Sequence, residues 1–278
     1  MMIDIHMHVG RLYSFEKKAL TPSYLLHFMD EHGIEKAALL PIESPEETHY
    51  YITTEYVLDV CKRHPDRFIP FCNADPRRGN ADLSTDFRTI LGEYKDRGCR
   101  GLGEAMSGLY VDDPRLQMIY EACGEFGLPI VFHLDALRNM DEVGLPRFEA
   151  MARKFPQTTF IGHGQHFWAE ISLDVKAEDF SKYPSGPVKP DGAVVRLLAE
   201  YPNVYGDLSA FSGFNAVTRD AEFGKRFLVE FQDKLLFGTD LCRRDQETPI
   251  IGYVRSLGTD SDAYRKIARA NAERLLGL

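Results

Sequence analysis

The chain has 278 residues, of which 44% are hydrophobic, and it carries a formal net charge of -9. This length allows a large hydrophobic core, and the acidic balance excludes the basic surface that nucleic-acid partners require. No apolar run approaches the roughly 18 residues that span a bilayer, and no signal peptide precedes the first predicted strand, so we expect neither membrane insertion nor secretion. The five cysteines are dispersed and form no C-x-x-C pair, which favours a reducing, cytoplasmic location over a disulfide framework.

Short apolar or β-branched runs alternate along the chain with longer segments of helical periodicity, a pattern that predicts parallel strands joined by helices. Pro or Asp opens several of the helical segments, and Gly or Pro closes them. The predicted strands are residues 2–8, 34–41, 67–74, 99–105, 129–134, 158–163, 203–209 and 234–240. The predicted helices are residues 22–32, 46–63, 81–97, 114–126, 146–154, 192–200, 215–232 and 263–276.

Eight strand and helix units in this length predict a single-domain TIM (β/α)8 barrel over residues 1–278. A doubly wound open sheet is the alternative, but no G-x-G-x-x-G turn follows the first strand to support it. One connection, residues 164–190, is longer than is usual between a strand and its helix. We expect it to shape a pocket or lid at the mouth of the barrel, with a surface insertion as the alternative.

Potential metal ligands stand at the ends of five predicted strands, where TIM barrels place their chemistry. The first strand ends in an H-x-H pair, and side chains two residues apart on a strand point the same way, so both histidines can share one ion. Asp4 is expected on that inward face, with Ile3 and Ile5 facing the helices. Imidazole and carboxylate groups without thiolates are typical of a hydrolytic zinc centre. The candidate ligands are His6, His8, Glu104, His133, His163 and Asp240.

Other side chains near the predicted mouth are candidates for contact with the substrate. His166 and Trp168 lie at the start of the long connection, where they either line the pocket or are ordinary loop residues. Arg11 follows the first strand and Arg243 follows the eighth, so their guanidinium groups flank the proposed ion and can pair with a carboxylate. Solvated loop arginines are the alternative. A small carboxylate-bearing or hydroxylated carbonyl compound is the substrate that these arginines indicate.

These motifs, in this order, resemble the amidohydrolase superfamily over nearly the whole chain. Within it they are most similar to the amidohydrolase-related group, which includes metal-dependent decarboxylases, lactonases and hydratases. The resemblance is carried by "IDIHMHVG", "GLPIVFHLD", "FIGHG", "NVYGDLS", "LLFGTDL" and the closing "NAERLLGL".

The resemblance implies a divalent metal, most often zinc. Related deoxyribonuclease-like branches bridge two metals with a fourth-strand glutamate, so Glu104 leaves both one ion and two open. His163 is implied to lie near the substrate or a second ion. The implied ligands of the first ion are His6, His8, His133 and Asp240.

A bound divalent metal activates water and polarises a carbonyl group. Asp240 is then expected to accept the proton of that water, and His163 to stabilise or protonate the developing oxyanion. We therefore expect a metal-dependent hydrolase of a small amide, ester or lactone. Decarboxylation of a small carboxylic acid, a lyase reaction, is the first alternative, and a non-catalytic barrel that binds a metal, ligand or partner is the second. A homo-oligomer is compatible with the sequence, which does not fix the oligomeric state.

Overall fold

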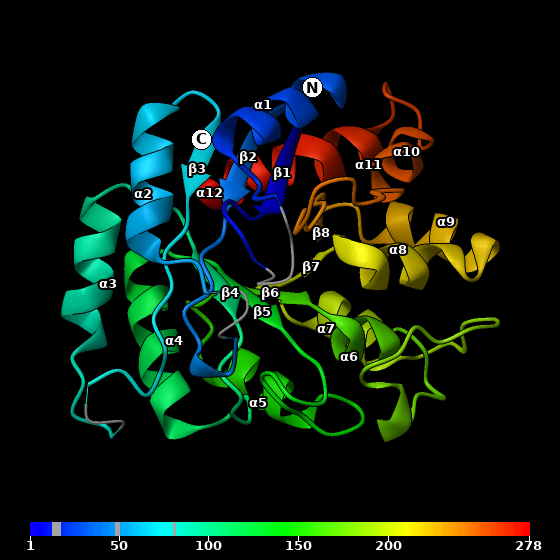
Figure 1. The fold of residues 1–278 in the computed structure, drawn as a ribbon. Helices are drawn as coiled ribbons and strands as arrows, with labels where there is room; N and C mark the ends of the chain where they lie inside the picture. The colour runs from blue at the N-terminus through cyan, green and yellow to red at the C-terminus, as the bar shows by residue number, and fades with distance from the viewer. Residues whose placement is uncertain (13–17, 48–50, 80–81) are drawn as a thin grey trace.

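In the part of the chain that the structure describes, eight short parallel strands alternate with helices (Figure 1). The structure is a computed structural model and describes residues 1–12, 18–47, 51–79 and 82–278. Each strand lies inside the range predicted for it, because a short apolar run fits the buried middle of a parallel sheet. The strands are β1 (Met2–Met7), β2 (Ile34–Leu39), β3 (Phe68–Pro70), β4 (Leu102–Ala105), β5 (Ile130–His133), β6 (Phe160–His163), β7 (Val204–Asp207) and β8 (Leu235–Leu236).

The strands form two parallel sheets, β1 to β3 and β4 to β8, each in chain order. Isolated parallel bridges join the two sheets at both edges. Cys72, beyond β3, bridges to Leu102 of β4, and Met7 of β1 bridges to Leu241, beyond β8. With these bridges every strand has a neighbour on both sides, as in a TIM barrel and unlike an open doubly wound sheet.

Helices α4 and α5 match their predicted ranges at both ends. Helix α4 follows Asp113, whose carboxylate accepts a hydrogen bond from Arg115 N, and ends at Gly127, which has a left-handed φ of 61°. The main helices are α1 (Pro22–Glu31), α2 (Thr54–Arg63), α3 (Phe87–Asp96), α4 (Pro114–Phe126), α5 (Pro146–Lys154), α7 (Ala193–Glu200), α8 (Ala210–Thr218), α9 (Ala221–Glu230), α11 (Asp262–Arg265) and α12 (Asn271–Leu276), the last two joined by a π-helical turn, Lys266–Ala270.

The predicted helices over residues 46–63 and 81–97 begin later in the structure. Thr53 caps α2 by accepting a hydrogen bond from Tyr56 N, and Asp86 caps α3 in the same way. A capping side chain satisfies backbone N–H groups that would otherwise be unpaired, so it fixes the first turn of each helix. Residues 48–50 and 81, which fall within these two predictions, lie outside the described part of the chain.

The predicted helix over residues 215–232 is two helices, α8 and α9. Asp220 separates them, because its carboxylate accepts a hydrogen bond from Phe223 N and so starts a new helix. The structure also contains two short helices that the sequence pattern does not predict, α6 (Gln165–Ala169) and α10 (Ile250–Arg255). Such short helices do not span enough turns to show a helical periodicity.

Buried apolar side chains pack in two separate clusters. The larger cluster draws on both the strands and the surrounding helices. The smaller one takes residues of alternating register from seven of the strands and packs them against α12, so it fills the barrel interior. Its members on and beside the strands are Ile3, Ile5, Ala38, Leu40, Ile69, Phe71, Val131, Ile161, Tyr205 and Leu236.

The prediction that Ile3 and Ile5 face the helices is wrong, because both belong to this interior cluster. The cause is a β-bulge in residues 4–7, where β1 advances three residues while β2 advances two. The bulge shifts the alternation of side chains between the two faces of the strand. His6 and His8 consequently reach the interior although they have the opposite parity from Ile3 and Ile5.

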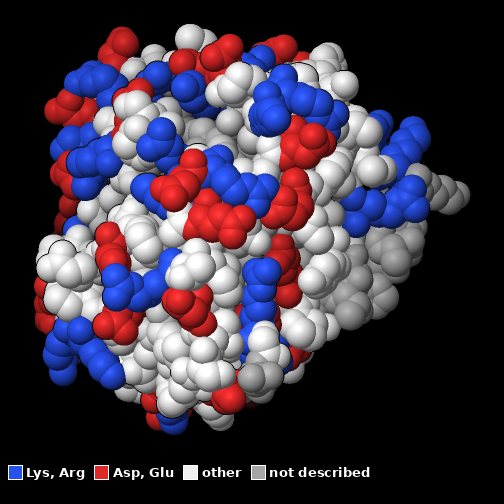
Figure 2. Space-filling model, turned by 90° about the vertical axis from the view of Figure 1, so that its left-hand side faces the viewer, with Lys and Arg blue, Asp and Glu red and all other residues white. Residues whose placement is uncertain are grey.

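Acidic and basic side chains are interspersed on the face that carries α2 and α3 (Figure 2). Ion pairs connect the helices of this region. Arg97, just beyond α3, lies 2.6 Å from Glu55 of α2, and Arg88 of α3 lies 2.5 Å from Glu125 of α4. Among the described residues, no helix combines the length and the hydropathy needed to cross a membrane.

Candidate metal centre and cavity

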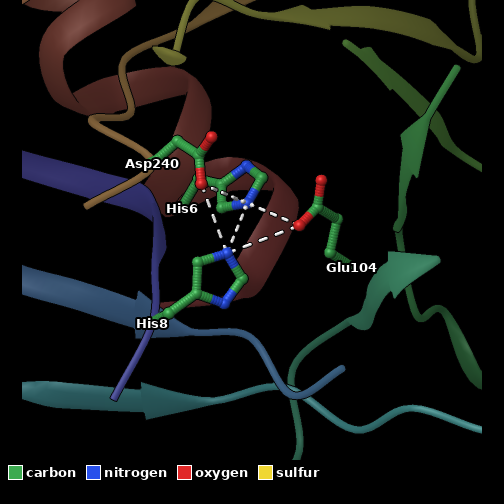
Figure 3. Close-up of side chains that lie close together, drawn as sticks. All are labelled: His6, His8, Glu104 and Asp240. Atoms are coloured by element: carbon green, nitrogen blue, oxygen red, sulfur yellow. Dashed lines mark hydrogen bonds and ion pairs between the residues drawn. The ribbon is translucent and has the colours of Figure 1, made fainter. Parts of the chain in front are cut away.

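Four side chains converge at the carboxyl ends of the strands (Figure 3). His6 and His8 come from the end of β1, Glu104 from β4, and Asp240 from the segment after β8. His6 Nε2 lies 3.2 Å from His8 Nε2, 3.5 Å from Glu104 Oε2 and 3.5 Å from Asp240 Oδ1. His8 Nε2 lies 3.4 Å and 3.3 Å from the same two oxygens. One nitrogen or oxygen of each side chain therefore points to a common centre.

Glu104 reaches this centre because β4 also contains a bulge. Between Leu102 and Ala105, β4 advances three residues while β5 advances two. Leu102 and Ala105 belong to the larger apolar cluster, which includes the surrounding helices, whereas the Glu104 carboxylate lies against the histidines of β1. β1, which leads to His6 and His8, and β4, which carries Glu104, are thus both bulged. Each bulge allows these polar side chains to point into the barrel.

The spacing of these donor atoms suits the ligands of one divalent cation. Five of the six distances between them are 3.2–3.5 Å, and two ligands that each lie about 2.0–2.2 Å from a zinc ion are separated by roughly 3 Å or more. The remaining pair of donor atoms, one carboxylate oxygen of Glu104 and one of Asp240, lies within 4.8 Å. Two imidazoles and two carboxylates also form a donor set that suits zinc and other first-row divalent ions. The residues therefore fit a divalent cation.

The protein fixes the second ring nitrogen of both histidines. His8 Nδ1 lies 2.9 Å from the Leu40 carbonyl oxygen, and His6 Nδ1 lies 2.7 Å from Asp207 Oδ2. A carbonyl oxygen accepts only, and the ionised carboxylate does the same, so Nδ1 donates and Nε2 keeps its lone pair for a cation. Both rings are oriented as metal ligands by contacts on their far side.

Asp207, at the end of β7, connects His6 with His163. Its Oδ2 lies 3.1 Å from His163 Nδ1 and accepts a hydrogen bond from the Ser209 hydroxyl at 2.7 Å, while its Oδ1 accepts one from Ser209 N at 2.9 Å. Burial alone would raise the pKa of Asp207, but the hydrogen bonds from His163 and His6 hold it well below its usual range. Asp207 was not among the predicted site residues, although it lies near the end of a predicted strand as the other candidates do.

His133 lies beside Glu104 rather than in the four-residue cluster. Its Nδ1 is 2.6 Å from Glu104 Oε1, and its Nε2 is 3.3 Å from Asp135 Oδ2. Burial would lower the pKa of His133, but the carboxylates of Glu104 and Asp135 raise it to about 9. His163 Nε2 lies 3.6 Å from the same Glu104 oxygen. His133 and His163 therefore both lie near Glu104 Oε1, whereas Glu104 Oε2 faces His6 and His8.

Asp4 contacts the main chain of His6 and not its imidazole ring. Its carboxylate accepts hydrogen bonds from His6 N at 2.9 Å, Thr239 N at 3.1 Å and the Thr239 hydroxyl at 2.7 Å. Burial raises the pKa of Asp4 to about 7. Asp4 thus ties β1 to the segment that carries Asp240, and it supports both sides of the cluster through the backbone.

A cavity of about 220 Å³ opens beside the cluster. The segments after β1, β2 and β4 contribute apolar side chains to its wall, and those after β5, β6 and β7 contribute most of the polar ones. Ser212 Oγ and Gln165 Oε1 are buried and have no hydrogen-bond partner among the described residues. Apart from the candidate ligands, the lining includes Leu12, Ile42, Met106, Arg138, Gln165, Tyr183, Ala210, Ser212 and Cys242.

His166 and Trp168, predicted near the substrate, are buried away from this cavity. Trp168 Nε1 donates to the Asp207 carbonyl oxygen at 2.8 Å, and its ring packs against Phe227. His166 stacks on Phe180 with ring centroids 3.4 Å apart. The segment forms helix α6 where a loop was expected, and the helix directs both side chains into the core. Neither side chain is among those that line the cavity.

Arg11 and Arg243 are exposed, and neither lines the cavity. The end of a strand does not determine the path of the loop that follows it, so proximity in sequence did not bring these guanidinium groups inward. Arg138, which the sequence analysis did not select, is the arginine of the cavity wall. Its Nη1 donates to Asp135 Oδ2 at 2.5 Å.

Solved structures with this fold are similar over most of the chain. An uncharacterised TIM-barrel protein from Bordetella bronchiseptica is 19% identical, with a TM-score of 0.70 over 99% of this chain and 98% of that one. A probable 2-pyrone-4,6-dicarboxylic acid hydrolase from Acinetobacter baumannii, with citric acid bound, is 15% identical, with a TM-score of 0.65 over 100% and 99%. A 5-carboxyvanillate decarboxylase from Novosphingobium aromaticivorans, complexed with manganese and 4-hydroxy-3-methoxy-5-nitrobenzoic acid, is 18% identical, with a TM-score of 0.58 over 91% and 79%.

At these identities the likeness concerns the fold alone. No curated protein sequence matches the chain. The family model described as amidohydrolase, however, matches residues 3–278, which span every strand of the barrel and every residue of the cluster. The chain therefore belongs to the amidohydrolase family.

Proposed function

We propose that the protein is a metal-dependent hydrolase of a small amide, ester or lactone. The observation that carries this proposal is the convergence of four donor atoms, on His6, His8, Glu104 and Asp240, at the spacing of ligands around one divalent cation. Zinc is the cation that we expect, because the spacing matches its bond lengths and the donor set is one that it prefers. Manganese, which the N. aromaticivorans structure contains, is the alternative.

We propose one ion rather than two. A second ion would need Glu104 Oε1 together with His133 and His163. Two ligands of one ion, each about 2.1 Å from it and at least a right angle apart, are separated by about 3 Å or more. Glu104 Oε1 and His133 Nδ1 are only 2.6 Å apart, which is a hydrogen-bond distance. His133 then serves to hold Glu104 in place.

A divalent cation held by His6, His8, Glu104 and Asp240 would lower the pKa of a water molecule and polarise a carbonyl group. Asp240 directs Oδ1 to the cluster and has Oδ2 available to accept the proton of the attacking water. His163 Nε2 lies 3.8 Å from that Oδ2, and the residue lines the cavity. We assign His163 to stabilise or protonate the substrate oxygen, and Asp207 Oδ2, 3.1 Å from His163 Nδ1, orients the ring for this role.

The cavity supports a small substrate. Its volume of about 220 Å³ lies below the roughly 300–1,000 Å³ of sites for drug-sized ligands. Buried polar atoms are normally paired, so the unpartnered Ser212 Oγ and Gln165 Oε1 are expected to pair with a polar group of the substrate. Arg138 adds a guanidinium group that suits a carboxylate. We place the substrate's reacting carbonyl at the cluster and its polar substituent at these three residues.

Decarboxylation of a small carboxylic acid is the second candidate function. It is favoured by the likeness of the fold to a decarboxylase that contains manganese. The same cation would then hold a substrate carboxylate, and a protein acid, for which His163 is placed, would protonate carbon. The two reactions can be told apart by their stoichiometry. Hydrolysis consumes one water molecule and releases no carbon dioxide, whereas decarboxylation releases carbon dioxide without consuming water.

Elemental analysis combined with a substrate screen tests the proposal. The purified wild-type protein should contain about one equivalent of divalent metal and should hydrolyse at least one member of a set of small amides, esters and lactones. The double variant His6→Ala/His8→Ala should lose the metal while keeping the wild-type circular dichroism spectrum. His27→Ala is the matched control, because His27 is an exposed helix histidine. Full metal content in the double variant refutes the site, and carbon dioxide release without hydrolysis supports the second function.

A further inference from the structure

Asp240, in the segment after β8, has an uncommon backbone conformation. Its φ is 52°, in the left-handed region that few residues other than glycine, asparagine and aspartate adopt. Its backbone N donates to the His6 carbonyl oxygen at 2.8 Å, which joins it to β1. This conformation directs Oδ1 to the histidines of the cluster. Some other contact must maintain it, because residues in this region depend on their surroundings to stay there.

Two side chains contact Asp240 from the segment that follows it. The Cys242 thiol donates to the Asp240 carbonyl oxygen at 3.1 Å or to Oδ1 at 3.0 Å, and the Gln246 side chain makes the shorter contact. Its Nε2 donates to the Asp240 carbonyl oxygen at 2.7 Å, and its Oε1 accepts a hydrogen bond from Cys242 N at 2.9 Å. One carboxamide thus spans both ends of the three-residue turn 240–242. Reversing the carboxamide would place the amide against the Cys242 N–H and the oxygen against the Asp240 carbonyl, so the two contacts fix its orientation.

We infer that Gln246 is a positioning residue for the metal centre, which holds Asp240 in the left-handed conformation required for Oδ1 to act as a ligand. The inference rests on the proposed function, since it assumes that the cluster binds a divalent cation. Gln246 is not itself among the four converging residues. It acts through the backbone of Asp240, as contacts behind a ligand do when they orient it.

Cobalt(II) binding to the chelator-treated protein tests the inference. Gln246→Met keeps the length of the side chain but removes both hydrogen bonds, and we expect its cobalt affinity to fall by about tenfold or more. The visible absorption spectrum of the bound cobalt should also change, because the geometry at Asp240 changes. Gln232→Met is the matched control. Gln232 also bonds the backbone, donating to the Val229 carbonyl oxygen at 2.8 Å, but it lies before β8, whereas Asp240 lies after that strand.

The outcomes separate this inference from the proposed function. Wild-type affinity and spectrum in a folded Gln246→Met protein refute the inference and leave the metal centre intact. Absence of cobalt binding in the wild type refutes the metal centre, and the inference with it. If Gln246→Met does not fold, Gln246→Glu carries the test, since a carboxylate can still accept from Cys242 N but cannot donate to Asp240. Weakened binding in that variant supports the inference, and unchanged binding refutes it.

Discussion

Replacing Asp207 by Asn tests whether the two site histidines depend on one carboxylate. In the wild type both carboxylate oxygens of Asp207 face donors. Oδ1 faces Ser209 N, and Oδ2 faces Nδ1 of His6, Nδ1 of His163 and the Ser209 hydroxyl. The side chain is fully buried. An asparagine must therefore direct its NH2 group at a donor in either orientation, because both oxygens of the aspartate are used as acceptors.

The size of the effect follows from these contacts. A buried donor left without an acceptor costs about 1–3 kcal/mol, so the free energy of unfolding of the metal-free protein should fall by about that amount. Loss of the partner behind a ligating histidine typically weakens metal binding roughly 10–100-fold, or about 1.4–2.8 kcal/mol. We therefore expect Asp207→Asn to be both less stable and weaker in metal binding.

Urea denaturation of the chelator-treated protein measures the first quantity, and titration with zinc or cobalt measures the second. Asp233→Asn is the control, because Asp233 is an exposed aspartate that pairs with Lys266 on the surface. That control should change the stability by less than about 0.5 kcal/mol and leave metal affinity unaltered. If Asp207→Asn behaves like the control in both assays, the shared carboxylate does not hold the histidines, and our account of the site is wrong.

Three further predictions follow from the same structure. Trp168→Phe removes the hydrogen bond to the Asp207 carbonyl oxygen and leaves a small void. The free energy of unfolding should fall by about 2–4 kcal/mol in a denaturation experiment, and the KM should not change. A raised KM with wild-type stability would instead support Trp168 as a substrate contact. His133 has a pKa raised from 6.5 to about 9, so its contribution to stability is complete below pH 6.5 and is lost as the pH rises to about 9. Denaturation of the metal-free protein across this range should show a decline of up to about 3 kcal/mol, which His133→Gln should abolish; a flat wild-type profile would contradict this. Asp240→Asn at saturating metal should reduce turnover by a factor of about 10² or more, because Asn cannot accept a proton near neutral pH, and near-wild-type turnover would assign that role elsewhere.

The sequence by itself determined the barrel and the positions at which its chemistry could lie. Apolar runs, a capping residue such as Asp113 and a proline in the first turn of a helix are local signals, so the eight strands and helices such as α4 and α5 lie where they were predicted. The order of the strands then required their ends to meet at one face. For this reason His6, His8, Glu104 and Asp240 could be named as candidate ligands before their distances were known.

Only the tertiary structure decided which of the candidates converge. The bulges in β1 and β4 add one residue each to their strands. A prediction that assumes strict alternation of side chains between the two faces cannot detect an added residue, so it assigned Ile3 and Ile5 to the wrong face. Glu104 lies with the histidines of β1, whereas His133 bonds the other Glu104 oxygen, a division that depends on ångström-scale register between strands. Helix α6 and the loops beyond the strands are held by contacts with distant segments, and these contacts rather than local sequence put Trp168 in the core and Arg138 at the cavity.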